Sequence, residues 1–198
     1  DFLTETGARF LPKLGEGLAV LAEPSRSPSR QRLQAELRRR LPKARWYEHE
    51  PTGFGVHHRA ASEVFGKPVR PRYKFEAARV IVSLDCDFLG AEPDTHLNIR
   101  GFAQGRRVEK PGDPMNRLYV VESLMSLTGA NADHRLRLPG SAVADVARAL
   151  AKAVGVAVDS PSSIPGVAPE WIQECANDLK AHRGGVLVVA GVGQPVAV

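Results

Sequence analysis

Three short stretches of the sequence carry the side chains that could perform chemistry. They are Asp85-Cys86-Asp87, Glu122-Ser123 and Gly191-Val192-Gly193. Paired carboxylates can hold a metal ion or act as acid and base, a cysteine can act as a nucleophile, and glycines let a phosphate approach backbone N–H groups. These stretches are far apart in the sequence, so they form a site only if the fold brings them together.

Each stretch also has a purely structural interpretation. Acids at strand ends cap turns, and a free cysteine is usually a small buried apolar residue. Gly-Val-Gly lacks the third spaced glycine and the helix of a dinucleotide fingerprint. His57 and His58 are adjacent, so they cannot form the i, i+4 pair of a zinc-binding helix. The sequence has no P-loop, nucleophile elbow or CxxC motif, and no catalytic constellation is complete in it.

Each of the three stretches follows an apolar run with the character of a buried strand. These runs cover residues 79–84, 117–121 and 186–190. Short, unbroken β-branched runs bounded by turn residues are typical of parallel strands that are buried on both faces. Parallel strands end at one edge of a sheet, where open α/β folds bind their ligands. We therefore expect an α/β fold: a three-layer, mainly parallel Rossmann-like sheet with helices on both faces.

Helical periodicity accompanies these strands. The clearest apolar stripe follows the possible cap Ser141 and consists of Val143, Val146, Ala147, Leu150 and Val154. Pro169 begins a second helix whose buried face includes Cys175. Helices are also expected from Pro28 to residue 41 and over residues 57–65. Residues 93–114 are polar and glycine-rich, and are predicted to form a long connecting excursion.

Three further strands and the domain limits complete the predicted architecture. The strands are expected over residues 17–22, 44–49 and 134–138. Residues 1–16 are interpreted as an N-terminal arm or short helix, and residues 17–198 as one α/β domain. The chain opens at Asp1 and closes within an apolar, glycine-rich segment, so we expect it to be an excised piece of a longer chain.

Composition limits the function classes. The net charge is +5, but the 27 Lys and Arg residues are mixed with 22 acids and aromatic residues make up only 6%. This pattern favours an ordinary solvated surface, with a basic nucleic-acid-binding module as a competing hypothesis. Two cysteines cannot by themselves hold an iron–sulfur cluster or a Cys-rich zinc site. Cys86 and Cys175 are expected not to be joined. No signal peptide or membrane-length apolar run occurs.

Residues 75–193 resemble the large subunits of the molybdopterin oxidoreductase superfamily, which includes dimethyl sulfoxide reductase and formate dehydrogenase. The sequence is most similar to one branch, the molybdopterin-like half of the iron–sulfur subunit of the alternative complex III quinol oxidoreductase. Three sequence motifs, called phrases below, carry this resemblance: "SLDxDFLG" at residues 83–90, "MNRLYVVES" at 115–123 and "SLTGxxADHRL" at 126–136. The resemblance implies a domain that shares the fold of the molybdenum enzymes in a branch thought to lack their cofactor.

The pocket-equivalent positions depart from the superfamily pattern. The superfamily binds the pterin nucleotide through small groups where this chain has Asp85-Cys86-Asp87. Its basic "DPR" position is here Glu122-Ser123-Leu124. A desolvated carboxylate beside a phosphate is repulsive by on the order of several kcal/mol. These positions, together with Gly191 and Gly193, are therefore expected to be vacant, with Arg135, Arg137 and the Arg106-Arg107 pair available to neutralise the acids.

The resemblance implies a subunit of a membrane-bound respiratory electron-transfer complex, with the other subunits as partners and no nucleic acid or direct membrane span. The domain would be a soluble structural scaffold, associated with the membrane through its partners, at the periplasmic face. Iron–sulfur clusters would lie elsewhere in the full chain, with no cofactor and no catalysis in this part. The alternative is a catalytic domain that binds molybdopterin dinucleotide.

Overall fold

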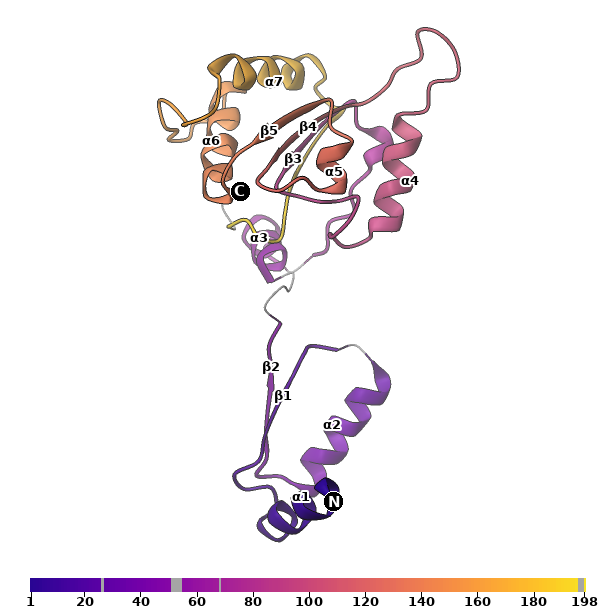
Figure 1. Cartoon of the computed structure of the whole chain (residues 1–198), viewed down its shortest axis with the longest axis vertical. Coiled ribbons are helices and arrows are strands. Elements are labelled where there is room, and N and C mark those ends of the chain that lie inside the picture. The colour runs from indigo at the N-terminus through magenta and orange to yellow at the C-terminus, as the bar shows by residue number, and fades with distance from the viewer. Residues whose placement is uncertain (26, 51–54, 68, 196–197) are drawn as a thin grey trace. The chain divides into compact units, whose positions relative to one another are not determined.

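The computed structural model describes residues 1–25, 27–50, 55–67, 69–195 and 198. The chain forms two compact units, Asp1–Gly53 and Phe54–Val198, each of which is described by itself (Figure 1). The sequence pattern predicted a boundary at residues 16 and 17 instead. The structure differs because, among the described residues, the first two strands pair with each other and with no strand of the main sheet.

The first unit is a small βαβ arrangement preceded by a helix. It contains α1 (Phe2–Phe10), the 3-10 turn η1 (Leu11–Lys13), β1 (Ala19–Ala22), α2 (Pro28–Arg40) and β2 (Arg45–Glu48). The strands β1 and β2 are parallel, with Leu21 opposite Tyr47. The predicted apolar stripe of α2 is not buried, since Leu33 is 64% exposed.

The second unit is built on a four-stranded parallel sheet in the order β5-β4-β3-β6. Its strands are β3 (Val80–Leu84), β4 (Arg117–Glu122), β5 (His134–Arg137) and β6 (Val186–Ala190). All five residues of β3 are buried, as expected for a central strand covered on both faces. The predicted α/β fold is confirmed: the sheet is flanked by helices in a three-layer, Rossmann-like arrangement.

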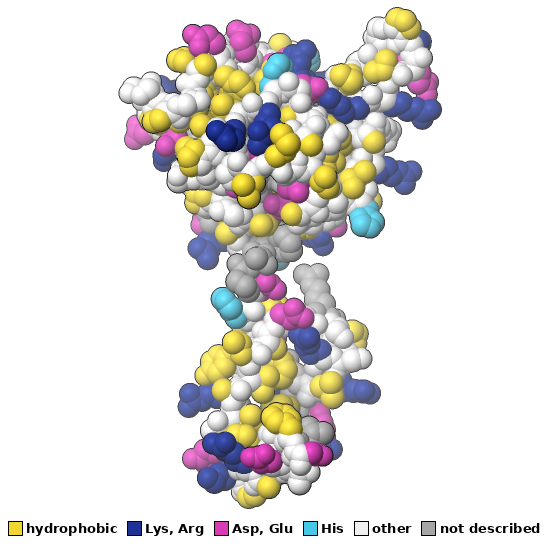
Figure 2. All heavy atoms as spheres, in the orientation of Figure 1, with side chains coloured by type: hydrophobic (Ala, Val, Ile, Leu, Met, Phe, Trp, Pro, Cys, Tyr) yellow, Lys and Arg dark blue, Asp and Glu magenta, His cyan; other side chains and the backbone are white. Residues whose placement is uncertain are grey.

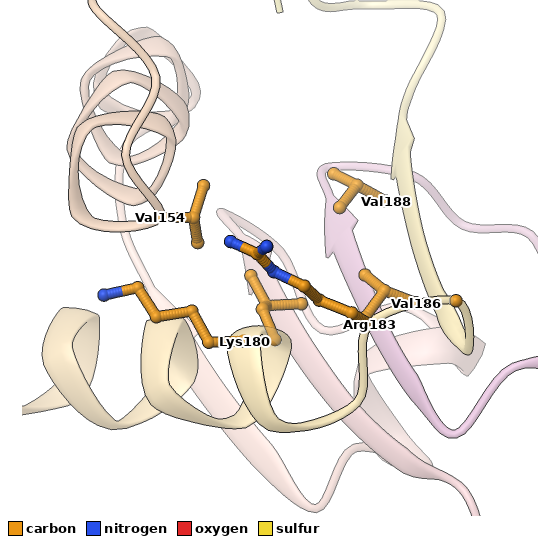
Figure 3. Close-up of a pocket in the computed structure, with 7 residues that line it drawn as sticks. Val154, Lys180, Arg183, Val186 and Val188 are labelled. Carbon is orange, nitrogen blue, oxygen red and sulfur yellow. The ribbon is translucent and has the colours of Figure 1, made fainter.

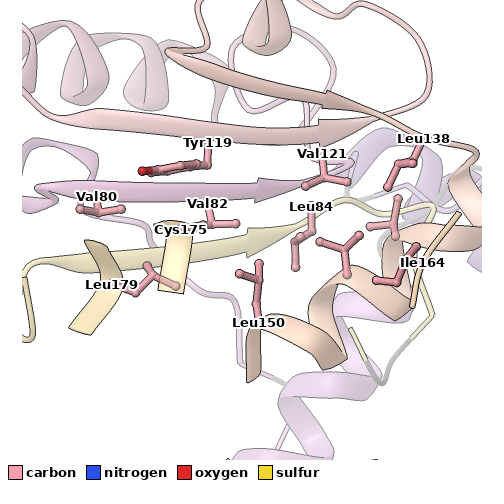
Figure 4. Close-up of a cluster of buried hydrophobic side chains, with 12 residues drawn as sticks. Val80, Val82, Leu84, Tyr119, Val121, Leu138, Leu150, Ile164, Cys175 and Leu179 are labelled. Carbon is pink, nitrogen blue, oxygen red and sulfur yellow. The ribbon is translucent and has the colours of Figure 1, made fainter. Parts of the chain in front are cut away.

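One face of the sheet is covered by α6 (Val143–Ala153) and α7 (Pro169–Ala181). Figure 4 shows Val80, Val82 and Leu84 of β3 directed toward the side chains of these helices. Cys175 is fully buried in this cluster. The predicted stripe of α6 is confirmed, although Ser141 lies within the 3-10 turn η3 (Gly140–Ala142) and Ala142 occupies the cap position.

The opposite face is covered by α4 (Thr95–Gly105) and the 3-10 turn η2 (Phe75–Ala77). Phe88 stacks on Phe75 and meets Phe102 of α4 edge-on. The sequence pattern missed α4, which lies within the predicted excursion. The apolar residues of α4 do not form a stripe on one face of the helix that a sequence pattern would detect. Leu97 and Ile99 are exposed, and Phe102 is the one large apolar residue of α4 that is buried.

The remaining helices of the second unit are α3 (Gly55–Phe65) and the single-turn α5 (Leu127–Ala130). Strands β3, β4 and β5 follow one another outward in the sheet, whereas β6 returns to the other side of β3. The chain therefore changes direction between β3 and β6. In open α/β sheets, ligands bind at the carboxyl ends of the strands at such a switch point.

Candidate functional site

Loops that follow β3, β4 and β6 contact one another beyond the carboxyl ends of these strands. Thr128, after β4, donates to Asp87, after β3, with an Oγ1–Oδ1 distance of 2.8 Å. Gln194, after β6, donates from Nε2 to Asp85 Oδ2 at 2.8 Å. The Val192 N–H donates to Glu92 Oε1 at 3.0 Å. The fold thus brings the three chemically capable stretches to one edge of the sheet.

Asp87 organises the turn that follows β3. Its Oδ1 accepts from the Thr128 N–H at 3.0 Å as well as from the Thr128 hydroxyl. Its Oδ2 accepts from the Ala91 N–H at 3.1 Å. A Cβ on Gly90 would overlap this carboxylate, so glycine is needed there. Asp87 therefore has the turn-capping role that its sequence position allowed, and its oxygens point to protein donors.

Asp85 and Gly191 close the switch point between β3 and β6. The Gly191 N–H donates to Leu84 O at 3.0 Å, and a Cβ on Gly191 would overlap the Asp85 carbonyl oxygen. Asp85 itself has a positive φ of 54°, a conformation that few side chains adopt readily. Backbone atoms of the two loops therefore lie directly against each other where an open α/β sheet would admit a ligand.

Glu92 is a buried acid that the sequence pattern did not identify. It is 9% exposed, and its Oε2 has no hydrogen-bond partner among the described residues. Burial raises the pKa of Glu92, and the neighbouring Asp87 and Asp85 add to this increase, while the Val192 N–H and His57 act in the opposite direction. This carboxyl is therefore easier to protonate than an exposed glutamate.

Glu122 is satisfied by its own surroundings. It is 4% exposed, and its Oε1 accepts from Arg135 Nε at 2.6 Å. Its Oε2 accepts from the Ser126 hydroxyl at 2.6 Å, and a Cβ on Gly129 would overlap the carboxylate. The prediction that Arg135 neutralises an acid is confirmed for Glu122. This pair holds the loop and short helix after β4 against β5.

Arg106 and Arg107 bind different acids. Arg106 forms a bidentate ion pair with Asp133, with N–O distances of 2.9 and 2.6 Å. Arg107 pairs with Glu109 at 2.6 Å. The prediction that the Arg106-Arg107 pair neutralises the strand-end acids was wrong, because these two residues, which follow α4, pair with Asp133 and Glu109 instead.

Cys86 is buried on the helix α4 side of the sheet, whereas Cys175 belongs to the α6 and α7 side. The two cysteines are free, as predicted. Burial raises the pKa of the Cys86 thiol, and the nearby acids Glu92, Asp87 and Asp85 add to this. A thiol that resists ionisation is a poor nucleophile, so Cys86 has the character of a core residue.

Ser123 and Gly193 lie outside this network of contacts. Both are exposed, and a Cβ on Gly193 would meet no atom within 4 Å. Of the predicted positions, the structure therefore brings Asp85, Asp87 and Gly191 together. Hydrogen bonds from or to three further residues hold these loops in contact, namely Glu92, Thr128 and Gln194. No sequence signal identifies these three partners, because Thr128 and Gln194 lie 41 and 109 residues from the acids that they bind.

These residues do not fit a pterin dinucleotide. Where the superfamily that residues 75–193 resemble has small phosphate-facing groups, this chain has the carboxylates of Asp85 and Asp87, and the Gly191 backbone lies against the Asp85 carbonyl. Within the described ranges, no three His, Cys, Asp or Glu side chains gather as ligands for a metal ion would. The arrangement joins three loops by internal hydrogen bonds, and Asp85, Asp87 and Glu92 each accept at least one of them.

Cationic side chains on the face shown in Figure 2 are scattered among hydrophobic and acidic ones rather than gathered in a stripe. This face therefore lacks the continuous basic groove that tracks a nucleic-acid backbone.

Comparisons with known proteins give no family for this chain: no family model matches it, and no curated protein matches it. None of the helices in the described part of the chain has the length and apolar character that crossing a membrane requires.

Proposed function

We propose that the unit Phe54–Val198 is a structural scaffold domain of a respiratory quinol oxidoreductase subunit, similar in fold to the molybdopterin oxidoreductases and without a bound molybdenum cofactor. The three phrases at residues 83–90, 115–123 and 126–136 motivate the assignment to this class of complex. The Rossmann-like sheet supports it, because these phrases fall on β3, β4 and β5 and on the loops that follow β3 and β4.

One observation carries the non-catalytic part of this proposal, namely the closed switch point. The Gly191 backbone lies against Asp85, and the Asp87 carboxylate accepts three hydrogen bonds from Thr128 and Ala91. A nucleotide diphosphate in this place would have to displace these bonds and lie beside two partly buried carboxylates. Such juxtaposed like charges are strongly unfavourable in a low-dielectric environment.

In this proposal the domain works through its partners. The other subunits of the complex bind the membrane and the quinol, and iron–sulfur clusters in another part of the full chain carry the electrons. The domain stays at the periplasmic face and positions these parts. The hydrogen bonds of Asp85 and Asp87 support this role, because they join the loops that follow β3, β4 and β6.

Native full-length protein, isolated with its complex from membranes, provides the test. Elemental analysis should find no molybdenum or tungsten, and oxidative extraction should release no pterin fluorescence. The protein should co-purify with quinol-oxidising activity. A stoichiometric pterin would instead support the alternative of a catalytic molybdopterin-dinucleotide domain. Purification as a single chain without quinol-oxidising partners would contradict the assignment to a respiratory complex.

The 198-residue chain offers a second, independent measurement. Guanosine diphosphate, which resembles the nucleotide end of the cofactor, should not bind in calorimetry. Replacing both acids in the variant Asp85→Asn/Asp87→Asn removes the charge but leaves the Gly191 contact, so this variant should not bind either. Binding gained by the variant would show that charge alone, rather than closure of the switch point, excludes the ligand.

A further inference from the structure

Strand β6 forms one edge of the main sheet. It pairs with β3, and within the described residues no strand pairs with its other side. Val188 in the middle of β6 is 50% exposed. A sheet edge with an exposed aliphatic residue is a template for another strand, unless the protein covers or blocks it.

The bonds to β3 determine which main-chain groups of β6 face outward. Gly185 O accepts from the Val80 N–H at 3.2 Å, and the Gly191 N–H donates to Leu84 O at 3.0 Å. Bonding alternates along a parallel strand, so the odd-numbered residues serve β3. The N–H and C=O groups of Val186 and Val188 therefore face the open side. His57 Nε2 lies 3.0 Å from the oxygen of the next even residue, Ala190, so α3 limits the open edge at its carboxyl end.

A cavity of about 340 Å³ adjoins this edge on the side of α6 and α7 (Figure 3). Val154, Val186 and Val188 supply aliphatic walls. Lys180 in the last turn of α7 and Arg183 just after it provide two cations, and Arg183 extends across the cavity toward Val154 (Figure 3). The open main-chain groups and the cavity therefore form one continuous surface.

The two cations have no acidic partner among the contacts of the described residues. The acid of α7 that is nearest to them in the sequence, Asp178, accepts from Arg117 at 2.7 Å and from the Tyr119 hydroxyl at 3.0 Å. Its other oxygen lies 3.3 Å from His182. Asp178 is thus fully engaged, and Lys180 and Arg183 remain available for carboxylates from outside the chain.

We propose that β6 is a docking strand for an extended segment of a partner protein in which aliphatic and acidic side chains alternate on one face. The segment adds to the sheet beside β6 and bonds to the outward groups of Val186 and Val188. Every second side chain of an added strand faces the cavity, at a spacing of roughly 6.6 Å. Aliphatic side chains then contact the valines, and carboxylates meet Lys180 and Arg183. Main-chain bonds supply affinity and the cavity supplies selectivity. This inference does not depend on the proposed function.

The 198-residue chain can be tested with a short synthetic peptide whose cavity-facing positions alternate valine and glutamate, with threonine between them. The peptide should bind, as measured by fluorescence anisotropy. Amide exchange at Val186 and Val188 should slow in its presence, whereas exchange at Leu187 and Val189, which already bond to β3, should not change. Equal changes at all four amides, or none, would contradict strand addition.

Charge reversal tests the role of the cations. The variant Lys180→Glu/Arg183→Glu should lose about tenfold or more in affinity and should gain affinity for a peptide that carries lysine in place of glutamate. Lys110→Glu reverses a charge at an exposed residue outside the cavity and serves as the matched control, which should bind like the unchanged protein. Equal losses in both variants would mean that net charge, not the cavity, attracts the peptide.

Val188→Pro tests the main-chain bond directly. Proline removes the outward N–H but no bond to β3, and it is tolerated on edge strands, so the melting temperature should stay near that of the unchanged protein while binding is lost. Three outcomes would overturn the proposal: full binding by Val188→Pro, tighter binding of decanoate than of the peptide at the cavity, or protection of Val188 by self-association of the chain without peptide.

Discussion

Thr128 connects two strand-end loops through a hydroxyl that is fully buried. Its Oγ1 donates to Asp87 at 2.8 Å and accepts from the Leu89 N–H at 3.0 Å. Thr128→Val preserves the shape of the side chain but removes both bonds. The Leu89 N–H is then buried without a partner, and Asp87 loses one donor. We expect the variant to unfold more easily than the unchanged protein for this reason alone.

The magnitude follows from the two bonds. A buried donor left without a partner costs about 1–3 kcal/mol, and a hydrogen bond to a charged group contributes about 1.5–3 kcal/mol. Asp87 keeps two backbone donors, Thr128 and Ala91, so we expect a loss of roughly 2–4 kcal/mol in total. For a unit of this size, that corresponds to a decrease in melting temperature of roughly 5–15 °C.

Urea unfolding followed by tryptophan fluorescence provides the assay. A Trp46→Phe background leaves Trp171, in the second unit, as the only tryptophan. Thr128→Ser is the matched control, because it keeps the hydroxyl and removes a buried methyl group, at a cost of about 1 kcal/mol. Thr128→Val should therefore be less stable than Thr128→Ser. The opposite order would show that Thr128 acts through packing and would refute the hydrogen-bonding explanation.

Three other features give predictions. Gly191→Ala should destabilise the second unit by roughly 3 kcal/mol through overlap with the neighbouring loop, whereas Gly193→Ala should be nearly neutral in the same urea titration. Because the pKa of Glu92 is raised above its ordinary value of 4.5, wild-type stability declines as pH increases through the native pKa. Glu92→Gln should thus match the wild type near pH 4 and exceed it above neutrality, and a constant difference across pH would contradict this. Burial raises the pKa of Cys175 to about 12, so Cys175 and Cys86 should react with thiol reagents only after denaturation, giving two free thiols without a reductant. Rapid labelling of native protein would contradict this expectation.

Three exposed apolar residues lie in the loop after β4 and at the start of α5. Leu124, Met125 and Leu127 are 81%, 70% and 61% exposed, in a segment whose neighbours are held by the Glu122–Arg135 pair. Isolated exposed apolar residues are ordinary, so these three carry no assignment of their own.

Local patterns in the sequence were sufficient for the elements of the main sheet. The runs that became β3, β4 and β6 are short, apolar and unbroken, which favours strands of a parallel sheet. All of β3 is buried, whereas Val188 of β6 is half exposed. The stripe of α6 and the proline at the start of α7 are equally local signals. Because parallel strands end at one edge, the meeting of the loops after β3, β4 and β6 also followed from the sequence.

Tertiary structure alone decided the rest, because the remaining contacts join residues without a local signature. Helix α4 has one large buried apolar side chain, Phe102, and its buried face is recognisable only once Phe75 and Phe88 are seen to pack around that ring. Asp87 became a turn cap rather than a ligand because Thr128, 41 residues away, turns its hydroxyl toward it. The sequence shows which side chains are available at the strand ends. Their chemistry depends on the donors that the folded chain brings within hydrogen-bonding distance, and at Asp85, Asp87 and Glu122 those donors are protein groups.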